Sequence, residues 1–373
     1  MQSAVQYIDT AMVGSLGTQA TAAVGATTTI GWLIGGSIGA FAIGFLAMIS
    51  KACGAEDPDT AQRTSAQAVL SVLVIGSVCT LLTTALSGLI PGWMQLEESI
   101  RPVASRYFLV LYLPMLPRTA STVLGTALRA AGDTKTPMKV GLIVNGINIL
   151  LNFLLIYPTR TLCLWGYSVT LPGAGMGVVG AAAASAVAFT WGGFQITRAL
   201  WRHPVISPRG RGLRPDRTIL GPCLRIALPN MLQRFGTSLG YVAFAAMINS
   251  LGAVATAAHT IANTVELAFY IPGYGMQTAA ATLTGQAYGA RDSRRMKSIT
   301  AMFLPIEMAL MCLSGGALFL AARPLMGLFS PSREVIDLGA TVVRRVAVSE
   351  PLFGVPIVVE GMMGVGRTRT PFL

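Results

Sequence analysis

Asp9 is a carboxylate within an apolar run at the start of the sequence, Met1 to Val13. An ionisable group at helix depth in a membrane is costly, and such groups are usually functional. Surroundings of low dielectric constant raise the proton affinity of a carboxylate, so its protonation can switch a conformation. Asp9 is therefore a candidate for coupling to a cation. The alternative is that it borders the outer end of a helix, close to Gly14 and Gly17.

Glu266 is a second such carboxylate, near the middle of a later apolar run, with Asn263 and Tyr270 each within one helical turn. This spacing places the three side chains on one polar face. We interpret them as part of a substrate cavity, in which Glu266 receives a cationic substrate or a proton. The alternative is that Glu266 is the buried partner of Arg234 or Arg118.

Three amides follow one another on a further apolar run. Asn148 and Asn152 are four residues apart, and Asn145 lies one turn earlier. Positions with this spacing share one helical face, which is expected to point into the helix bundle. Asn145 is a candidate cavity residue. The simpler interpretation of the stripe is hydrogen bonding between neighbouring helices, which is common in membranes and modestly stabilising.

The other motifs and polar residues of the sequence are weaker candidates for a functional site. The GMGVVG segment fits GxGxxG, but no strand precedes it and it opens an apolar helix. The five cysteines are scattered without CxxC spacing, and with the two histidines they form no convincing metal set. No cofactor is predicted, and the absence of a Walker motif points to an ion gradient as the energy source. The remaining carboxylates are weaker candidates: Glu307 and Glu360 within apolar runs, and Glu350, which we expect near a membrane surface.

Apolar runs of membrane-spanning length must position these groups. Of the 373 residues, 53% are hydrophobic and only 11% are charged, which is far from the composition of soluble domains. A helix needs about 20 apolar residues to cross a bilayer. Nine spans are predicted: Val24–Ile49, Ala66–Ile90, Tyr107–Leu128, Val140–Tyr157, Gly177–Leu200, Leu220–Ile248, Ala257–Leu283, Ile299–Ala322 and Val346–Gly366.

The basic residues follow the membrane topology. With the first apolar run directed outward, 18 of the 27 Lys and Arg residues fall in inner loops and 7 in outer loops. This bias matches the positive-inside rule. The net charge of +12 therefore reports topology rather than nucleic-acid binding, and acidic lipid headgroups are the expected partners of the basic loop Arg198–Arg225.

The sequence repeats itself at an offset of 235 residues. MVGSLGTQATAAVG from Met12 matches MINSLGAVATAAHT from Met247 at eight of fourteen positions, and KACGAED from Lys51 aligns with QAYGARD from Gln286. Six helices separate equivalent positions, which predicts two lobes with the same orientation, residues 1–205 and 206–373. Compared with each other, the copies suggest a first helix cut short and two C-terminal helices missing, or about nine and a half of twelve helices.

Several blocks resemble the multidrug and toxic compound extrusion (MATE) family. They are YIDTAMVGSLG, GQAYGA, LRAAGDTKTPM, NGINILLNFLLI and GVVGAAAASA, which occur in the family's order over nearly the whole chain. The resemblance implies an all-α polytopic membrane protein with two six-helix lobes, a central cavity, and antiport of amphipathic, often cationic compounds against protons or sodium ions.

The resemblance also implies roles for particular residues. The position of Asp9 matches the aspartate that takes up the coupling cation, and Asn148 and Ser185 match further positions of that site. Asn152 departs from the family, which commonly has an Asp there. One carboxylate instead of two weakens charge compensation for sodium, so the sequence favours H⁺ over Na⁺.

These features predict a multidrug exporter of the cell inner membrane that is not an enzyme, is monomeric, binds small molecules and lipids, and binds no nucleic acid. A flippase for a lipid-linked precursor is the rival transport function, and it would require a strongly basic cavity. A membrane-embedded transferase would require paired acids or a His/Asp centre on a loop. An inactive, truncated product is a fourth reading.

Overall fold

The computed structural model describes residues 12–13, 18–93, 98, 100–164, 167–329 and 332–366. The chain forms two compact units. Unit 1 contains the described residues up to Phe45 together with Pro58–Gly221, and unit 2 contains Leu46–Asp57 and the described residues from Pro222 onward. Residues 206–221 thus pack within unit 1. The lobes that the repeat predicts, 1–205 and 206–373, stay a prediction.

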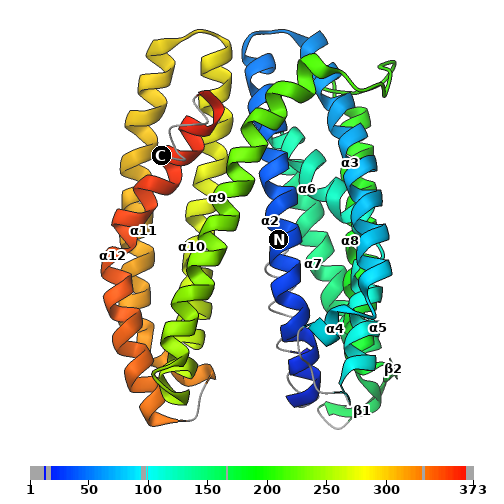
Figure 1. Cartoon of the computed structure of the whole chain (residues 1–373), viewed down its shortest axis with the longest axis vertical. Helices are drawn as coiled ribbons and strands as arrows, with labels where there is room; N and C mark the ends of the chain where they lie inside the picture. Colours follow the sequence, from blue (N-terminus) through cyan, green and yellow to red (C-terminus); the bar gives the residue numbers. More distant parts are fainter. Residues whose placement is uncertain are drawn as a thin grey trace. The chain divides into compact units, whose positions relative to one another are not determined.

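Unit 1 is a group of helices with one hairpin (Figure 1). Its elements are α2 (Thr18–Gly54, whose last turns belong to unit 2), α3 (Pro58–Leu86), α4 (Ile90–Trp93), α5 (Arg101–Tyr112), α6 (Met115–Ala130), α7 (Lys135–Leu155), β1 (Pro158–Leu164), β2 (Tyr167–Ala174) and α8 (Gly177–Arg202). Helix α8 packs on α5, α6 and α7, and α3 packs on α6. At these contacts small residues allow close approach, since a Cβ atom at Gly193 would collide with the backbone of Pro117.

The predicted span Tyr107–Leu128 is two helices rather than one. Helices α5 and α6 meet at a bend of 46°, and Pro114 is the residue that precedes α6. Proline lacks the N–H group that a continuous helix needs and clashes with the preceding turn. The bend therefore follows from the LPMLP segment, which the hydrophobic run alone does not reveal.

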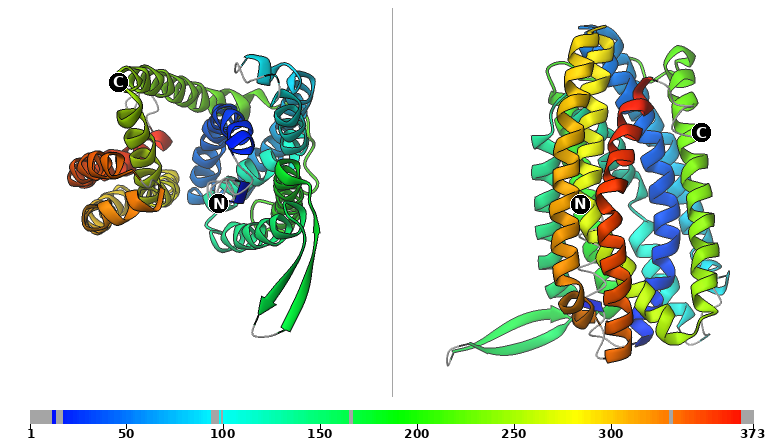
Figure 2. Two further views of the ribbon diagram at one scale, coloured as in Figure 1. Left: turned by 90° about the horizontal axis from the view of Figure 1, so that it is seen from below. Right: turned by 90° about the vertical axis from the view of Figure 1, so that its left-hand side faces the viewer.

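The antiparallel pair β1 and β2 was not predicted, and the expectation that no strand precedes the GMGVVG segment is wrong, because β2 ends at Ala174. The strands pair from Leu164 with Tyr167 to Pro158 with Ala174, with an irregularity between Pro158 and Arg160. Figure 2 shows the hairpin extending away from the helices of unit 1. After it the chain returns directly to α7, because the N–H groups of Gly175 and Met176 donate to the carbonyls of Tyr157 and Leu155 at 3.0 and 2.9 Å. The hairpin thus leaves α7 and α8 side by side.

Unit 2 contains four long helices (Figure 1). They are α9 (Arg217–Asn249, whose first turn belongs to unit 1), α10 (Ala253–Gly289), α11 (Ser293–Phe329) and α12 (Arg333–Gly366). Helices α10, α11 and α12 all pack against one another. Two apolar clusters stabilise them, one around Leu318 and Met326 and the other around Phe303 and Val358.

The helix ends repeat as closely as the sequence does. Helices α2 and α10 are both 37 residues long and begin 235 residues apart. Each is followed by a residue in the left-handed region, Glu56 and Arg291, both with φ of 55°. The N–H groups of Asp57 and Asp292 then donate to the carbonyls five residues earlier, at 3.0 Å in both copies. This pattern caps a helix C-terminus, and it confirms that the two sequence blocks build the same local structure.

The two repeated helix ends also contact each other within unit 2. A Cβ atom at Gly54 would collide with the carbonyl of Gln286, and one at Gly289 would collide with the carbonyl of Lys51. These contacts are reciprocal, because Lys51 and Gln286 are equivalent positions in the repeat. Glycine at both positions allows the backbones to meet.

Within the described residues, six helices are long and apolar enough to cross a membrane, and the bent pair α5 and α6 makes a seventh span. The other two predicted spans lie within α9 and α10. These helices are more polar; α10, for example, carries His259, Asn263 and Glu266. The all-α, multi-pass membrane class is confirmed, with the hairpin as an addition.

Candidate functional site

The amide stripe of α7 forms a hydrogen-bonded network with α8 in unit 1. The Asn148 side-chain N–H donates to the hydroxyl oxygen of Ser185 at 3.0 Å, and the Asn152 N–H donates to the Asn148 oxygen at 3.2 Å. All three side chains are fully buried. The structure thus brings together three of the four predicted coupling residues. Their role in coupling stays a prediction.

Asn145 is separate from this network. Among the described residues, its buried side-chain oxygen has no hydrogen-bond partner. A buried polar atom in that state requires a water molecule, a ligand or another segment of the chain. Its predicted place in a substrate cavity is consistent with this need and stays a prediction.

Asp9 lies outside the described residues. The described part nearest to it in sequence is Met12–Val13, where the Met12 carbonyl accepts a hydrogen bond from the Tyr157 hydroxyl at 3.2 Å. Val13 packs in a cluster with Tyr107 and Ile156. The predicted role of Asp9 therefore stays a prediction.

Arg118 is an arginine within the membrane helices of unit 1. Its guanidinium carbon lies 4.9 Å from the ring centre of Phe189 and 5.5 Å from that of Tyr112. Such stacking stabilises a cation at low dielectric constant. Because Arg118 belongs to unit 1 and is held by two aromatic rings there, the structure supplies no support for pairing it with Glu266.

Glu266 and Tyr270 both lie on α10. The two residues are one turn apart, on the same face of the helix. Among the described residues no ion pair includes Glu266, and Arg234 is exposed. Asn263 lies one turn before Glu266 and is partly buried, and no hydrogen bond of its amide is found within the described part of the chain. The assignment of these three residues to a substrate cavity stays a prediction.

Glu307 is, with Glu350, one of the two fully buried carboxylates among the described residues. It lies in α11, its side chain is fully buried, and neither oxygen has a hydrogen-bond partner among the described residues. If Gly273 carried a Cβ atom, that atom would lie 2.9 Å from Oε1 of Glu307. A Cβ atom at Gly354 would lie 3.1 Å from the same oxygen. Glycines of α10 and α12 therefore make the space for this carboxyl group. The sequence does not predict this enclosure, because the contacts come from distant segments.

Glu350 is not near a helix end, and its expected place near a membrane surface stays a prediction. It lies midway along α12, is fully buried, and its two oxygens have no hydrogen-bond partner among the described residues. Its Oε2 lies 3.3 Å from the point that a Cβ atom would take at Gly315 of α11. The helix continues through Pro351 and Pro356.

Buried carboxyl groups of this kind suit proton transfer. In an apolar helix bundle an isolated carboxylate is strongly disfavoured, so Glu307 and Glu350 are neutral unless a cation or water reaches them. Among the described residues no three His, Cys, Asp or Glu side chains gather as metal ligands. The prediction that the protein holds no cofactor stays untested. The chemistry available to these two groups is uptake and release of a proton, or of a monovalent cation.

Known proteins resemble the chain over nearly its full length. Probable multidrug resistance protein NorM of Thermotoga maritima is 25% identical over 366 residues, which cover 98% of this chain and 76% of that protein. Probable multidrug resistance protein YoeA of Bacillus subtilis is 23% identical over 378 residues, which cover 99% and 78%.

Solved structures share the fold. MATE in the straight conformation has a TM-score of 0.88 at 23% identity, and covers 99% of this chain and 81% of its own. A MOP superfamily transporter from Pyrococcus furiosus has a TM-score of 0.83 at 23% identity, and covers 100% and 80%. The MatE family model matches residues 1–154 and 229–373. The chain therefore belongs to the MatE family, whose members are membrane transporters and not enzymes.

Proposed function

We propose that the protein is a secondary active antiporter that exports amphipathic, cationic compounds in exchange for protons or sodium ions. The observation that carries this proposal is the pair of fully buried carboxyl groups, Glu307 and Glu350, on α11 and α12, without hydrogen-bond partners among the described residues. Such groups are expensive in a membrane, and binding a proton removes their charge. The names of relatives such as the T. maritima NorM protein support multidrug export.

The two units contribute different chemistry in this proposal. In unit 1, Asp9 takes up the coupling cation while Asn148, Asn152 and Ser185 surround the site. In unit 2, Glu266 and Tyr270 receive the positively charged substrate, and Glu307 and Glu350 exchange protons. A bound proton stabilises a conformation in which a carboxyl group is dry, and its release favours one in which water reaches that group.

The proton is our proposed coupling ion. The amide network of Asn148 and Asn152 is neutral and internally hydrogen-bonded, so it adds no negative charge for a sodium ion. Sodium binding in proteins relies on charge compensation as well as on oxygen ligands, and here only Asp9 would supply it. We expect the protein in the inner membrane, with its Arg-rich and Lys-rich loops on the cytoplasmic side.

Substitution of Asp9 by Asn is expected to abolish gradient-driven efflux of a fluorescent cation from cells, because the amide cannot gain or release a proton. Asp337→Asn is the matched control, since Asp337 is exposed and pairs with Arg323 at 2.7 Å. Replacing sodium by choline in the same assay is expected to leave efflux by the unmodified protein unchanged. Unchanged, gradient-dependent efflux in Asp9→Asn would remove the coupling role, and loss of efflux in choline would identify sodium as the ion.

A further inference from the structure

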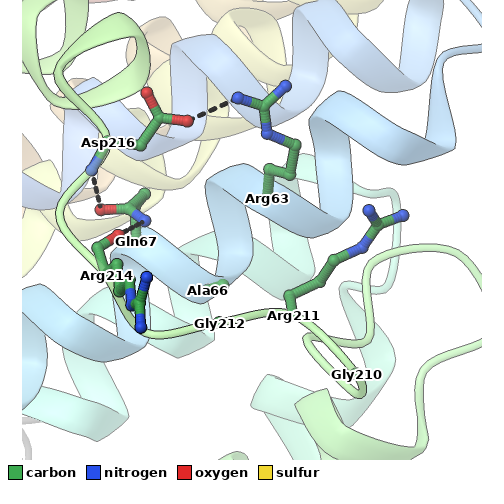
Figure 3. A pocket seen from close by; sticks show the side chains of 8 residues that line it. All are labelled: Arg63, Ala66, Gln67, Gly210, Arg211, Gly212, Arg214 and Asp216. Atoms are coloured by element: carbon green, nitrogen blue, oxygen red, sulfur yellow. Dashed lines mark hydrogen bonds and ion pairs between the residues drawn. The ribbon is translucent and has the colours of Figure 1, made fainter.

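The start of α3 and the segment 206–216, which we name the linker, enclose a cavity of about 300 Å³ within unit 1. Arg63, Ala66 and Gln67 of α3 form one wall, and Gly210, Arg211, Gly212, Arg214 and Asp216 of the linker form the other (Figure 3). Three arginines and one carboxylate make this cavity basic. The function proposed above assigns no role to it.

The linker is held against α3 by Gln67, whose side chain is almost fully buried. Its amide N–H donates to the Arg214 carbonyl at 2.8 Å, and its oxygen accepts from the Asp216 backbone N–H at 3.1 Å. Figure 3 shows both bonds at the wall of the cavity. A side chain that bonds to two linker residues fixes the shape of the cavity before any ligand arrives.

Asp216 helps to hold the linker in place, and its single negative charge does not neutralise the three arginines of the cavity. It pairs with Arg63 at 2.5 Å, and hydrogen bonds from Thr218 and then Arg63 hold its pKa below the usual range. Arg211 pairs with Asp59 at 2.6 Å. Among the described residues, Arg214 has no ion pair, and neither have its linker neighbour Arg209 and the nearby Arg217. A surplus of positive charge is left at the cavity.

The linker is open on one side of its main chain. Nothing lies within 4 Å of the points where Gly210 and Gly212 would carry a Cβ atom. A ligand can therefore approach the linker there without meeting a side chain.

The position of the cavity suits a membrane surface. Helix α3 is one of the apolar membrane-spanning helices, and the cavity lies at its first turns. Leu213 lies in the linker between Arg211 and Arg214 and is 44% exposed. Val205, just before the linker, is 41% exposed. Apolar side chains beside arginines favour the boundary between headgroups and acyl chains.

We propose that this cavity binds the phosphate group of an anionic phospholipid, with Arg214 as its main contact and Gln67 as the residue that shapes it. Arg214→Gln is expected to lower the affinity for fluorescent phosphatidylglycerol about fivefold, which is the effect of removing one basic residue near a membrane surface. Gln67→Leu is expected to lower it as well, although no charge changes, because the linker loses its anchor.

The test is binding of the purified full chain in nanodiscs to fluorescent phosphatidylglycerol, with phosphatidylcholine as the neutral lipid. Arg294→Gln is the matched control, since Arg294 is exposed and has no ion pair among the described residues. An equal loss in Arg294→Gln would show diffuse attraction and overturn the proposal. Equal binding of both lipids, or full displacement by millimolar inorganic phosphate, would overturn it too. These readouts do not depend on transport.

Discussion

Substitution of Glu307 by Gln is expected to slow proton-driven efflux by roughly 5- to 150-fold, the range that corresponds to a coupling free energy of about 1–3 kcal/mol between two ligands. Glutamine has the shape of the neutral acid, so the space between Gly273 and Gly354 stays filled. It cannot release a proton, and it holds the unit in the protonated conformation. Initial rates of efflux of a fluorescent cation from proteoliposomes with an imposed pH gradient would measure the loss.

Glu334→Gln is the matched control for this variant. It makes the same change in unit 2, in the first turn of α12, where the side chain is exposed. We expect its rate to equal that of the unmodified protein. We also expect Glu307→Gln to be at least as stable in thermal unfolding, because no hydrogen bond among the described residues is lost. A Glu307→Gln protein that transports at the unmodified rate would contradict the proton-exchange role.

Substitution of Asn148 by Leu is expected to lower the free energy of unfolding by about 1–3 kcal/mol, the cost of leaving a buried polar group unsatisfied. The change removes the donor to Ser185 and the acceptor of the Asn152 N–H, at nearly constant volume. Efflux is expected to fall with it, since the network is part of the proposed coupling site. Unfolding of the purified protein by a graded detergent denaturant would measure the stability.

Asn145→Leu is the control for the Asn148 substitution. It makes the same change one turn away on α7, but the Asn145 oxygen has no partner to lose among the described residues. Its stability is expected to equal or exceed that of the unmodified protein, because burial of an unpaired polar atom is relieved. Equal destabilisation by the two substitutions would show that the hydrogen bonds of Asn148 to Ser185 and Asn152 do not explain its contribution.

Hydrophobic run length predicts the helices well because a bilayer enforces it. Seven of the nine predicted runs lie wholly within a helix or the bent pair of helices, and the other two, Ala66–Ile90 and Val140–Tyr157, extend past the ends of α3 and α7. The 235-residue repeat goes further and predicts equal helix ends, which the matching conformations of Glu56 and Arg291 confirm. Both signals are local and survive in a single sequence.

The hairpin and the bend depend on weaker signals. The strands Pro158–Leu164 and Tyr167–Ala174 are short, and an apolar sequence on both sides hides their alternation. The bend at Pro114 competes with an otherwise continuous apolar run, and prolines inside α11 and α12 show that such residues do not always break a membrane helix. Single prolines therefore cannot be interpreted without their neighbours in space.

The candidate site also has features that the sequence predicts and features that it does not. The spacing of Asn148 and Asn152 predicts a shared face, and the structure joins them by a hydrogen bond. The enclosure of Glu307 depends on glycines of two other helices, far away in sequence. The equivalent position in the first copy of the repeat is Val72. The repeat therefore does not predict a carboxylate at position 307. Burial of this kind arises from packing and cannot be deduced from the order of residues along one helix.

The most direct test of antiport is a measurement of proton movement driven by substrate alone. Proteoliposomes that contain the unmodified chain and an internal pH dye, with no imposed gradient, would receive a lipophilic cation on one side. The account predicts an immediate proton flux opposite in direction to the cation, which disappears in Glu307→Gln and persists in Glu334→Gln. Cation transport without any proton movement, at equal rates with and without sodium, would contradict it.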